Sequence, residues 1–316
     1  MNLKSLIAII ALVMVPWSFS ASGGVLALST FQADVTPPIG SPLCYGGRMP
    51  AVTVQDPLTA RGVVLAPEGD PPIVLCAVDW IGIANEGYTV YRQALADAVR
   101  TSIDRVAVHA LHQHDAPGCD FTIDSMLSEH GVENSLFNAD FAHEAIERTA
   151  EAAKESMSTT HTITQIGAGR AKVEKVASNR RLVGPDGKVA HMRFTACPDP
   201  ELRAWPEGTI DPYVNVVSFW NEDDPIAVLS YYATHPQSYY GQGNVSADFV
   251  GMARSIRAGA IPGAKIIHFT GAAGNIGAGK YNDGSHENRP VLAWRLADGM
   301  KRAWEKTEKT PIDSED

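Results

Sequence analysis

The sequence lacks the features that favour nucleic acids, nucleotides or thiolate metal sites. Its 36 acidic side chains outnumber the 26 lysines and arginines, which gives a net charge of −10, and no basic cluster offsets this excess. A negatively charged body repels phosphate backbones, so nucleic acid is not an expected partner. No GxGxxG or GxxxxGK[ST] motif is present, and no two cysteines are spaced as CxxC. Neither a nucleotide site nor a cysteine zinc site is therefore predicted.

Cysteines are few, and no internal repeat occurs at the periods of solenoid proteins. Cys44, Cys76, Cys119 and Cys197 would allow two disulfides, with the pairing left open. Cys76 lies within the apolar run PIVLCAV and is more typical of a small core residue than of a disulfide partner. No pattern in the sequence sets an oligomeric state.

Long apolar runs are absent except at the N-terminus. Lys4 precedes the unbroken run Leu6–Val15, Pro16 ends it, and the small residues Ala21–Gly24 follow. This order is typical of a secretory signal peptide, and the run reaches only half of the ~20 residues that a membrane-spanning helix needs. We therefore predict a signal peptide at residues 1–24, an exported (periplasmic or extracellular) domain at residues 25–316, and no stable membrane span after cleavage.

Short apolar runs bounded by turn residues predict strands, and apolar side chains three and four residues apart predict helices. The linker Asn221–Pro225 favours a hairpin, and the polar tail Glu308–Asp316 is expected to fray. Alternating helices and strands with a hairpin predict an α/β fold with mixed β-sheets layered with helices, in a single large domain. The predicted strands are 62–66, 73–80, 106–111, 163–167, 214–220, 226–234 and 265–269; the predicted helices are 88–99, 141–153, 249–256 with Ser246 as N-cap, and one that begins at Pro290.

Histidines follow two of the predicted strands. His112-Gln113-His114 comes directly after the strand at 106–111, and His235 ends the run at 226–234. In extended backbone, residues two apart point to the same side, which can deliver two imidazoles to one metal ion. The alternative is a pair of surface or hydrogen-bonded core histidines. A glycine-rich segment at 271–279 follows a third strand and is either a ligand-binding loop or a plain tight turn.

Five motifs in order resemble the N-terminal catalytic domain of the neutral/alkaline ceramidases. Ala33–Gly40 is similar to the opening ADIT-type motif of that family, and Leu111–Gly118 is similar to its THTHSGPG. The other three are Ser178–Arg180 for NRS, Ala233–Pro236 with Ser246–Phe249 for VHP…SADF, and Asn275–Asn282 for NLGDVSPN. The resemblance spans the chain from about Ala33 to Trp304.

This resemblance implies a zinc-dependent hydrolase of linear amides that acts on a small-molecule or lipid N-acyl substrate. Two neutral imidazoles suit Zn²⁺, and an open coordination position can hold the attacking water. The residues that the resemblance implies are His112 and His235 as zinc ligands, His114 as a proton-transfer or orienting group, Arg180 at the substrate or the developing oxyanion, and Asn275 and Gly277 as substrate-binding residues.

The sequence also departs from the family pattern. The family completes its zinc site with a Glu and a Tyr from a later part of the domain, and no segment here matches that part. Lys280 stands where the family has Ser, which argues against ceramide itself as the substrate, and Asp115 adds a carboxylate beside His114. The alternatives are a non-catalytic or truncated ligand-binding relative, and a hydrolase of the same fold that cleaves an ester or a sugar-linked amide. The candidate substitute ligands are Asp79, Asp115, Asp248, Asp283 and Glu287.

Overall fold

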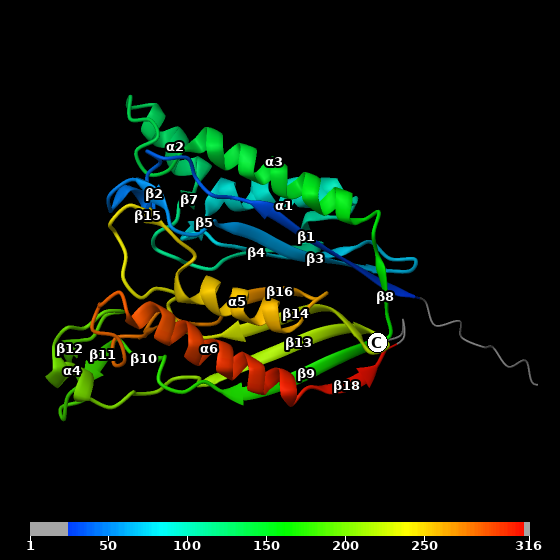
Figure 1. The fold of residues 1–316 in the computed structure, drawn as a ribbon. Helices are drawn as coiled ribbons and strands as arrows, with labels where there is room; N and C mark the ends of the chain where they lie inside the picture. The colour runs from blue at the N-terminus through cyan, green and yellow to red at the C-terminus, as the bar shows by residue number, and fades with distance from the viewer. Residues whose placement is uncertain (1–24, 313–316) are drawn as a thin grey trace, which may run out of the picture.

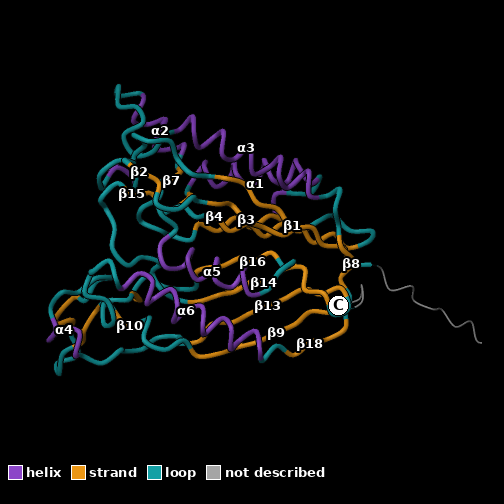
Figure 2. Tube along the Cα trace, in the orientation of Figure 1, coloured by secondary structure: helices purple, strands orange, loops and turns teal. Residues whose placement is uncertain are grey.

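The computed structural model describes residues 25–312, so the predicted signal peptide lies outside the described residues (Figure 1). The apolar clusters show four layers in the order helix, sheet, sheet, helix. In Figures 1 and 2, α1 and α3 lie over the first sheet and α5 and α6 are seen in front of the second. This arrangement confirms the predicted α/β class, with mixed sheets layered with helices in one domain. The main helices are α1 (Asn85–Val99) and α3 (Ala139–Ser156) in one outer layer, and α5 (Asp248–Ala260) and α6 (Asn288–Glu305) in the other.

The first sheet has five strands in the order β6-β4-β3-β1-β8. β4 and β6 are parallel and are connected through α1, whereas the other neighbours are antiparallel. Helices α1 and α3 pack on its outer face. Its strands are β1 (Leu26–Asp34), β3 (Thr59–Pro67), β4 (Ile73–Val78), β6 (Val106–Ala110) and β8 (His161–Ile163).

The second sheet has the same architecture, in the order β16-β14-β13-β9-β18. Here β14 and β16 are the parallel pair, connected through α5, and the other neighbours are again antiparallel. The chain thus runs twice through one topology, over residues 26–163 and 165–311. The strands are β9 (Gln165–Lys172), β13 (Tyr213–Asn221), β14 (Asp224–Tyr232), β16 (Lys265–Thr270) and β18 (Glu308–Pro311).

Three apolar clusters hold the layers together. Leu28 of the first sheet and Leu229 of the second belong to the cluster between the sheets. Trp80 lies under α1 and α3, and Leu296 lies between α6 and the second sheet. All four side chains are at most 1% exposed, and each such burial stabilises the fold by roughly 1.5–3 kcal/mol.

Short paired segments gather the loops at one end of the sandwich. Figure 1 shows β5, β7 and β10 at the end opposite β8 and β18. The pairs are β2 (Thr53–Val54) with β15 (Asn244–Val245), β5 (Gly82–Ile83) with β7 (Gly118–Cys119), β10 (Ser178–Asn179) with β17 (Ile276–Gly277), and β11 (Arg181–Val183) with β12 (Val189–Met192).

Most predicted elements are confirmed, including the hairpin between β13 and β14. The strand predicted at 163–167 is confirmed in part: residues 165–167 begin β9, but Ile163 belongs to β8, which Thr164 separates from β9 and which lies in the other sheet. The tail prediction is wrong over residues 308–311, because β18 pairs with β9 along the edge of the second sheet. Helix α6 begins at Asn288 instead of Pro290. The prediction missed β1, β18, α2 (Phe121–Ser128) and α4 (Pro200–Ala204).

All four cysteines fall within the described residues and are free, so neither of the allowed disulfides forms. Cys76 is fully buried in β4, as predicted for a small core residue. No helix between residues 25 and 312 combines the length and the apolarity needed to cross a membrane.

Candidate metal centre

A cavity of about 540 Å³ opens where the parallel strands of both sheets end. Its lining comes from the segments that contain or follow β4, β6, β14 and β16, together with Arg180. In folds with parallel strands, ligands bind in the crevice outside the carboxyl ends of those strands. The lining residues are Ile81, Gly82, Ile83, Val108, His109, Ala110, His112, Arg180, His235, Thr270, Gly271, Ala273 and Gly274.

The three predicted site histidines converge beside this cavity, and two of them, His112 and His235, line it. His112, His114 and His235 each offer one ring nitrogen, and these three nitrogens lie within 4.8 Å of one another. The Nε2 atoms of His112 and His114 are 3.3 Å apart. In the part of the chain that the structure describes, no other group of three or more histidine, cysteine or acidic side chains comes together in this way.

Backbone carbonyl groups orient two of the three rings. His112 Nδ1 lies 2.6 Å from the Ile81 carbonyl oxygen, and His235 Nδ1 lies 2.7 Å from that of Ala273. A carbonyl oxygen only accepts, so each Nδ1 carries the proton and each Nε2 keeps its lone pair. Metal-binding histidines are generally fixed in this way by a hydrogen bond to the second ring nitrogen. The two rings therefore fit a metal ion.

Burial favours the neutral form of His114 and His235. Burial, together with the neighbouring His112 and His235, lowers the pKa of His114 to about 3. Burial also lowers the pKa of His235, partly opposed by its hydrogen bonds to backbone carbonyls. Because neutral imidazole is the form that binds Zn²⁺, both side chains are ready for a metal ion at neutral pH.

The backbone at His112 differs from the expected extended strand. β6 ends at Ala110, and His112 has a φ of 77°, in the left-handed region that side chains other than Gly rarely adopt. The His112 N–H donates to the Trp80 carbonyl oxygen at 2.9 Å, which ties this turn to the end of β4. His112 and His114 converge through this strained turn, and the prediction of extended backbone is wrong.

A buried carboxylate supports the loop between the two histidines. Gln113 donates from Nε2 to Asp79 Oδ1 at 3.0 Å, and both side chains are fully buried. Arg254 of α5 donates to the two oxygens of Asp79 at 2.8 and 2.6 Å, and the Thr59 backbone N–H and hydroxyl also donate to this carboxylate. Although burial alone would raise the pKa of Asp79, Arg254 holds it below the usual value.

None of the five carboxylates considered as substitute ligands belongs to the histidine cluster. Asp79 is paired with Arg254, while Asp115 and Asp248 lie 3.6 and 3.1 Å from Arg289. Burial raises the pKa of Asp115 to about 6. The remaining two lie at the start of α6, where Asp283 accepts from the Ser285 and Asn288 nitrogens and Glu287 is the N-cap residue.

Arg180 reaches the cluster from the loop before β11. Its Nη1 donates to His235 Nε2 at 3.1 Å, and its buried Nε has no partner among the described residues. The Arg180 backbone N–H donates to the Asn275 carbonyl oxygen at 2.7 Å, and the side chain of Asn275 accepts from Arg181. Gly277 is buried in β17. Neither Asn275 nor Gly277 lines the cavity, and Asn275 instead positions the loop that carries Arg180.

Lys280, the departure from the family pattern, also lies outside the cavity lining. Its Nζ donates to the carbonyl oxygens of Arg203 and Trp205 at 2.9 and 2.5 Å, at the carboxyl end of α4. A cation there binds the unpaired carbonyl groups and interacts favourably with the helix dipole. The substitution therefore supports α4.

Sequence reasoning missed several side chains next to the cluster. The Tyr240 ring stands edge-on to His114, with 4.7 Å between ring centroids, and Arg48 lies over the Tyr240 ring at 5.3 Å. Cys44 Sγ is 3.9 Å from His114 Nδ1, and Cys44 has a φ of 52°. The tyrosine-rich loop after His235 was a sequence signal for Tyr240. Nothing in the sequence points to Cys44 or Arg48.

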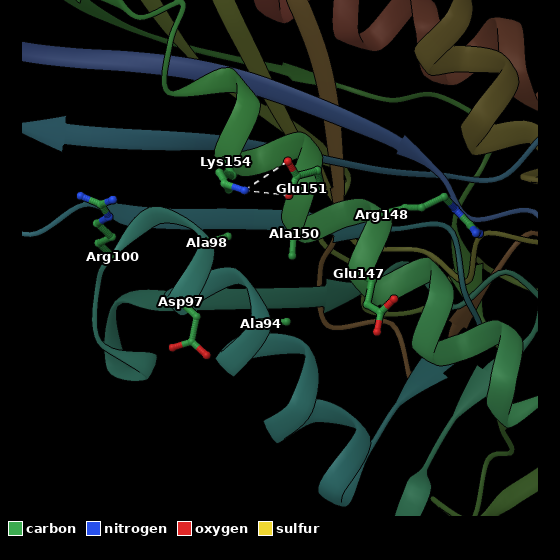
Figure 3. Close-up of a pocket in the computed structure, with 9 residues that line it drawn as sticks. All are labelled: Ala94, Asp97, Ala98, Arg100, Glu147, Arg148, Ala150, Glu151 and Lys154. Atoms are coloured by element: carbon green, nitrogen blue, oxygen red, sulfur yellow. Dashed lines mark hydrogen bonds and ion pairs between the residues drawn. The ribbon is translucent and has the colours of Figure 1, made fainter.

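A second cavity, of about 760 Å³, lies between α1 and α3 (Figure 3). Alanines of both helices form its floor, and charged side chains such as Asp97, Glu147 and Lys154 surround it. Lys154 is paired with Glu151 at 3.1 Å. None of its lining residues belongs to the histidine cluster, so this groove is separate from the candidate metal centre.

No protein-family model and no curated protein sequence matches the chain. Solved structures do match. A neutral ceramidase from Pseudomonas aeruginosa superposes with a TM-score of 0.65 and 16% identity over 90% of this chain. A ceramidase complexed with C2 gives a TM-score of 0.64 and 16% identity, also over 90%. The chain spans less than half the length of these proteins, 45% and 44% respectively.

The histidine cluster thus lies in a fold that this chain shares with the ceramidases. The likeness confirms, at the level of fold, the resemblance that the five sequence motifs predicted. At 16% identity, this likeness shows a shared architecture.

Proposed function

We propose that the chain is a zinc-dependent hydrolase of linear amide bonds in N-acyl substrates. One observation carries the proposal: three histidines converge at a cavity mouth, beside an arginine whose Nε lacks a partner among the described residues. The ceramidase structures of the same fold support amide hydrolysis as the reaction class.

The chain's own residues suit each requirement of that reaction. His112 and His235 would hold the metal through Nε2, because their Nδ1 atoms are already bound to carbonyl oxygens. A bound zinc ion would make hydroxide available from water near neutral pH and would polarise the amide carbonyl. The free Nε–H of Arg180 would donate to the carbonyl oxygen as its negative charge develops.

The cavity also suits an N-acyl chain. Its lining includes the apolar side chains of Ile81, Ile83, Val108 and Ala110, and the space around Gly274 is open within 4 Å of an added Cβ. A volume of about 540 Å³ falls within the ~300–1,000 Å³ range of small-molecule sites. Because Lys280 lies outside the lining, the replacement of the family's Ser does not close the cavity to a lipid amide.

The test combines metal analysis with a substrate panel. Protein purified under metal-replete conditions is analysed for zinc and assayed with N-acyl amides of increasing chain length, including a ceramide, and with matched esters. We expect one zinc per chain and amide cleavage, both lost in His112→Ala and His235→Ala. Cleavage of only the esters would assign another bond to the same fold. Absence of zinc from the wild type would refute the proposal and leave a non-catalytic ligand-binding relative.

We also propose that the protein is exported, on the basis of the signal-like order at residues 1–24. Expression of the full chain in a bacterial host, followed by fractionation and mass measurement, checks this. The expected product is found outside the cytoplasm and lacks about the first 24 residues. A full-length cytoplasmic product would contradict export.

A further inference from the structure

We infer that His114 is the third metal ligand, so that this chain carries a three-histidine centre of its own. The inference rests on the proposed metal-dependent function and deepens it. It replaces the expectation that His114 is a free proton-transfer group, and it makes the centre independent of any acidic or tyrosine ligand.

The spacing of the two nearest nitrogens carries the inference. The His112 and His114 Nε2 atoms are 3.3 Å apart. Nitrogen atoms at ~2.0–2.1 Å from a tetrahedral Zn²⁺ are separated by ~3.3 Å, the edge of the tetrahedron. Because His112 Nδ1 carries the proton, His112 Nε2 accepts a hydrogen bond from His114 Nε2–H. A shared zinc ion would replace that proton and bind both nitrogens at the same separation.

The surroundings of His114 hold its ring in this orientation. Its Nδ1 faces Cys44 Sγ at 3.9 Å, and the edge-on Tyr240 ring packs against it. Its Nε2 is therefore the nitrogen that faces the cluster.

The remaining donors near the cavity are engaged elsewhere. Asp79 is bound by Arg254, and Asp115 and Asp248 lie against Arg289. His109 lines the same cavity, but its Nε2 accepts the Thr270 N–H at 3.2 Å. His114 is thus the third donor that the described chain supplies. Three protein ligands with one open position are the usual set for catalytic zinc.

Arg180 has to release His235 when a metal ion binds. Its Nη1 now donates to His235 Nε2, the lone pair that a metal ion would use. The three ligand nitrogens, spread over at most 4.8 Å, can close on a metal only if Arg180 releases His235. The released guanidinium is then free to bind the oxygen of a substrate carbonyl, so metal loading prepares the arginine for the substrate.

Zinc titration against a chromophoric chelator tests the inference without measuring activity. The variants are His112→Asn, His114→Asn and His235→Asn, with His109→Asn as the matched control from the same cavity. Loss of an outer partner of a ligand costs ~10–100-fold in affinity, so loss of a ligand is expected to cost roughly 100-fold or more. We expect this loss in the first three variants and little change in His109→Asn, with circular dichroism confirming that each is folded.

A ligand exchange supplies a second readout. Under reducing conditions, His114→Cys loaded with Co²⁺ is expected to show a thiolate-to-cobalt charge-transfer band that the wild type lacks. Wild-type affinity in His114→Asn, together with no such band in His114→Cys, would overturn the inference while leaving the proposed function intact. A wild type that binds no zinc would overturn both.

Discussion

The ion pair between Asp79 and Arg254 joins the two halves of the chain, and breaking it is expected to be costly. Asp79 follows β4 in the first half, and Arg254 lies on α5 in the second. Two hydrogen bonds of 2.8 and 2.6 Å connect them, and the side chains are 0% and 4% exposed. Asp79→Ala leaves a buried guanidinium without its counter-charge.

The expected cost follows from this burial. Removing one partner of a buried ion pair destabilises a protein by ~3–5 kcal/mol, because the remaining charge is uncompensated. Asp79→Ala also removes the acceptor of the Thr59 and Gln113 hydrogen bonds, so we expect the upper part of this range. Replacing both partners, in Asp79→Ala/Arg254→Met, removes both charges of the pair and is expected to cost less than Asp79→Ala and Arg254→Met together.

Urea unfolding, followed by circular dichroism, measures the double-mutant cycle. We expect a coupling energy between the two sites of at least ~2 kcal/mol. Arg302→Met is the matched control, since Arg302 pairs with Asp298 at the same 2.8 Å but both side chains are more than a third exposed. It is expected to cost only ~0.3–0.5 kcal/mol. Additive effects of the Asp79 and Arg254 changes, within ~0.5 kcal/mol, would refute the reasoning.

Three further changes test the pH response, the arginine and the cavity. Burial lowers the pKa of His268 to about 3, so the unfolded chain takes up a proton first and stability falls as pH drops from ~6.5 toward 3. Between pH 7 and pH 5, the wild type should therefore lose ~2 kcal/mol more unfolding free energy than His268→Asn. The same dependence of unfolding free energy on pH in both proteins would contradict this. Arg180→Met removes a charge-assisted hydrogen bond, worth ~1.5–3 kcal/mol, to His235 Nε2. This change should tighten zinc binding by roughly 10-fold or more and abolish turnover. Arg181→Met, whose side chain contacts Asn275 instead, should leave the zinc affinity unchanged. A side chain fits at both Gly274 and Gly259, because an added Cβ meets nothing within 4 Å at either position. Gly274→Leu fills part of the cavity and should lower kcat/KM for N-acyl substrates by roughly 10-fold, whereas Gly259→Leu, on the surface of α5, should leave it unchanged. Equal activities of the two variants would place the substrate elsewhere.

The sequence pattern predicted the buried strands well because those strands are continuous apolar runs. β4, β13, β14 and β16 are rich in Val and Ile and end at turn residues, so local propensity and tertiary environment agree. β1 and β18 were missed for the opposite reason. β1 mixes polar residues into its apolar positions, and β18 is fully exposed at a sheet edge. Each becomes a strand only through hydrogen bonds to a strand far away in the sequence, β1 to β3 and β18 to β9.

The sequence predicted which residues form the candidate site, but not how their side chains are arranged. Motif order placed His112, His114, His235 and Arg180 together, and the structure brings all four to one cluster. Spacing alone could not show the left-handed turn at His112, because that turn depends on a hydrogen bond to the end of β4. For the same reason, no sequence pattern distinguishes the carboxylates bound by arginine from those free to bind a metal.

The duplicated topology explains why the centre draws on both halves. Each half supplies a parallel pair, β4 with β6 and β14 with β16, and the crevice lies outside the carboxyl ends of all four strands. The HxH pair follows β6 of the first half, and His235 follows β14 of the second. A metal ion bound by all three histidines would therefore link the halves directly. The Asp79–Arg254 ion pair already joins them, and Gln113, between His112 and His114, donates to Asp79 of that pair. The ion pair and the histidine cluster thus belong to one interface between the two halves, connected through Gln113.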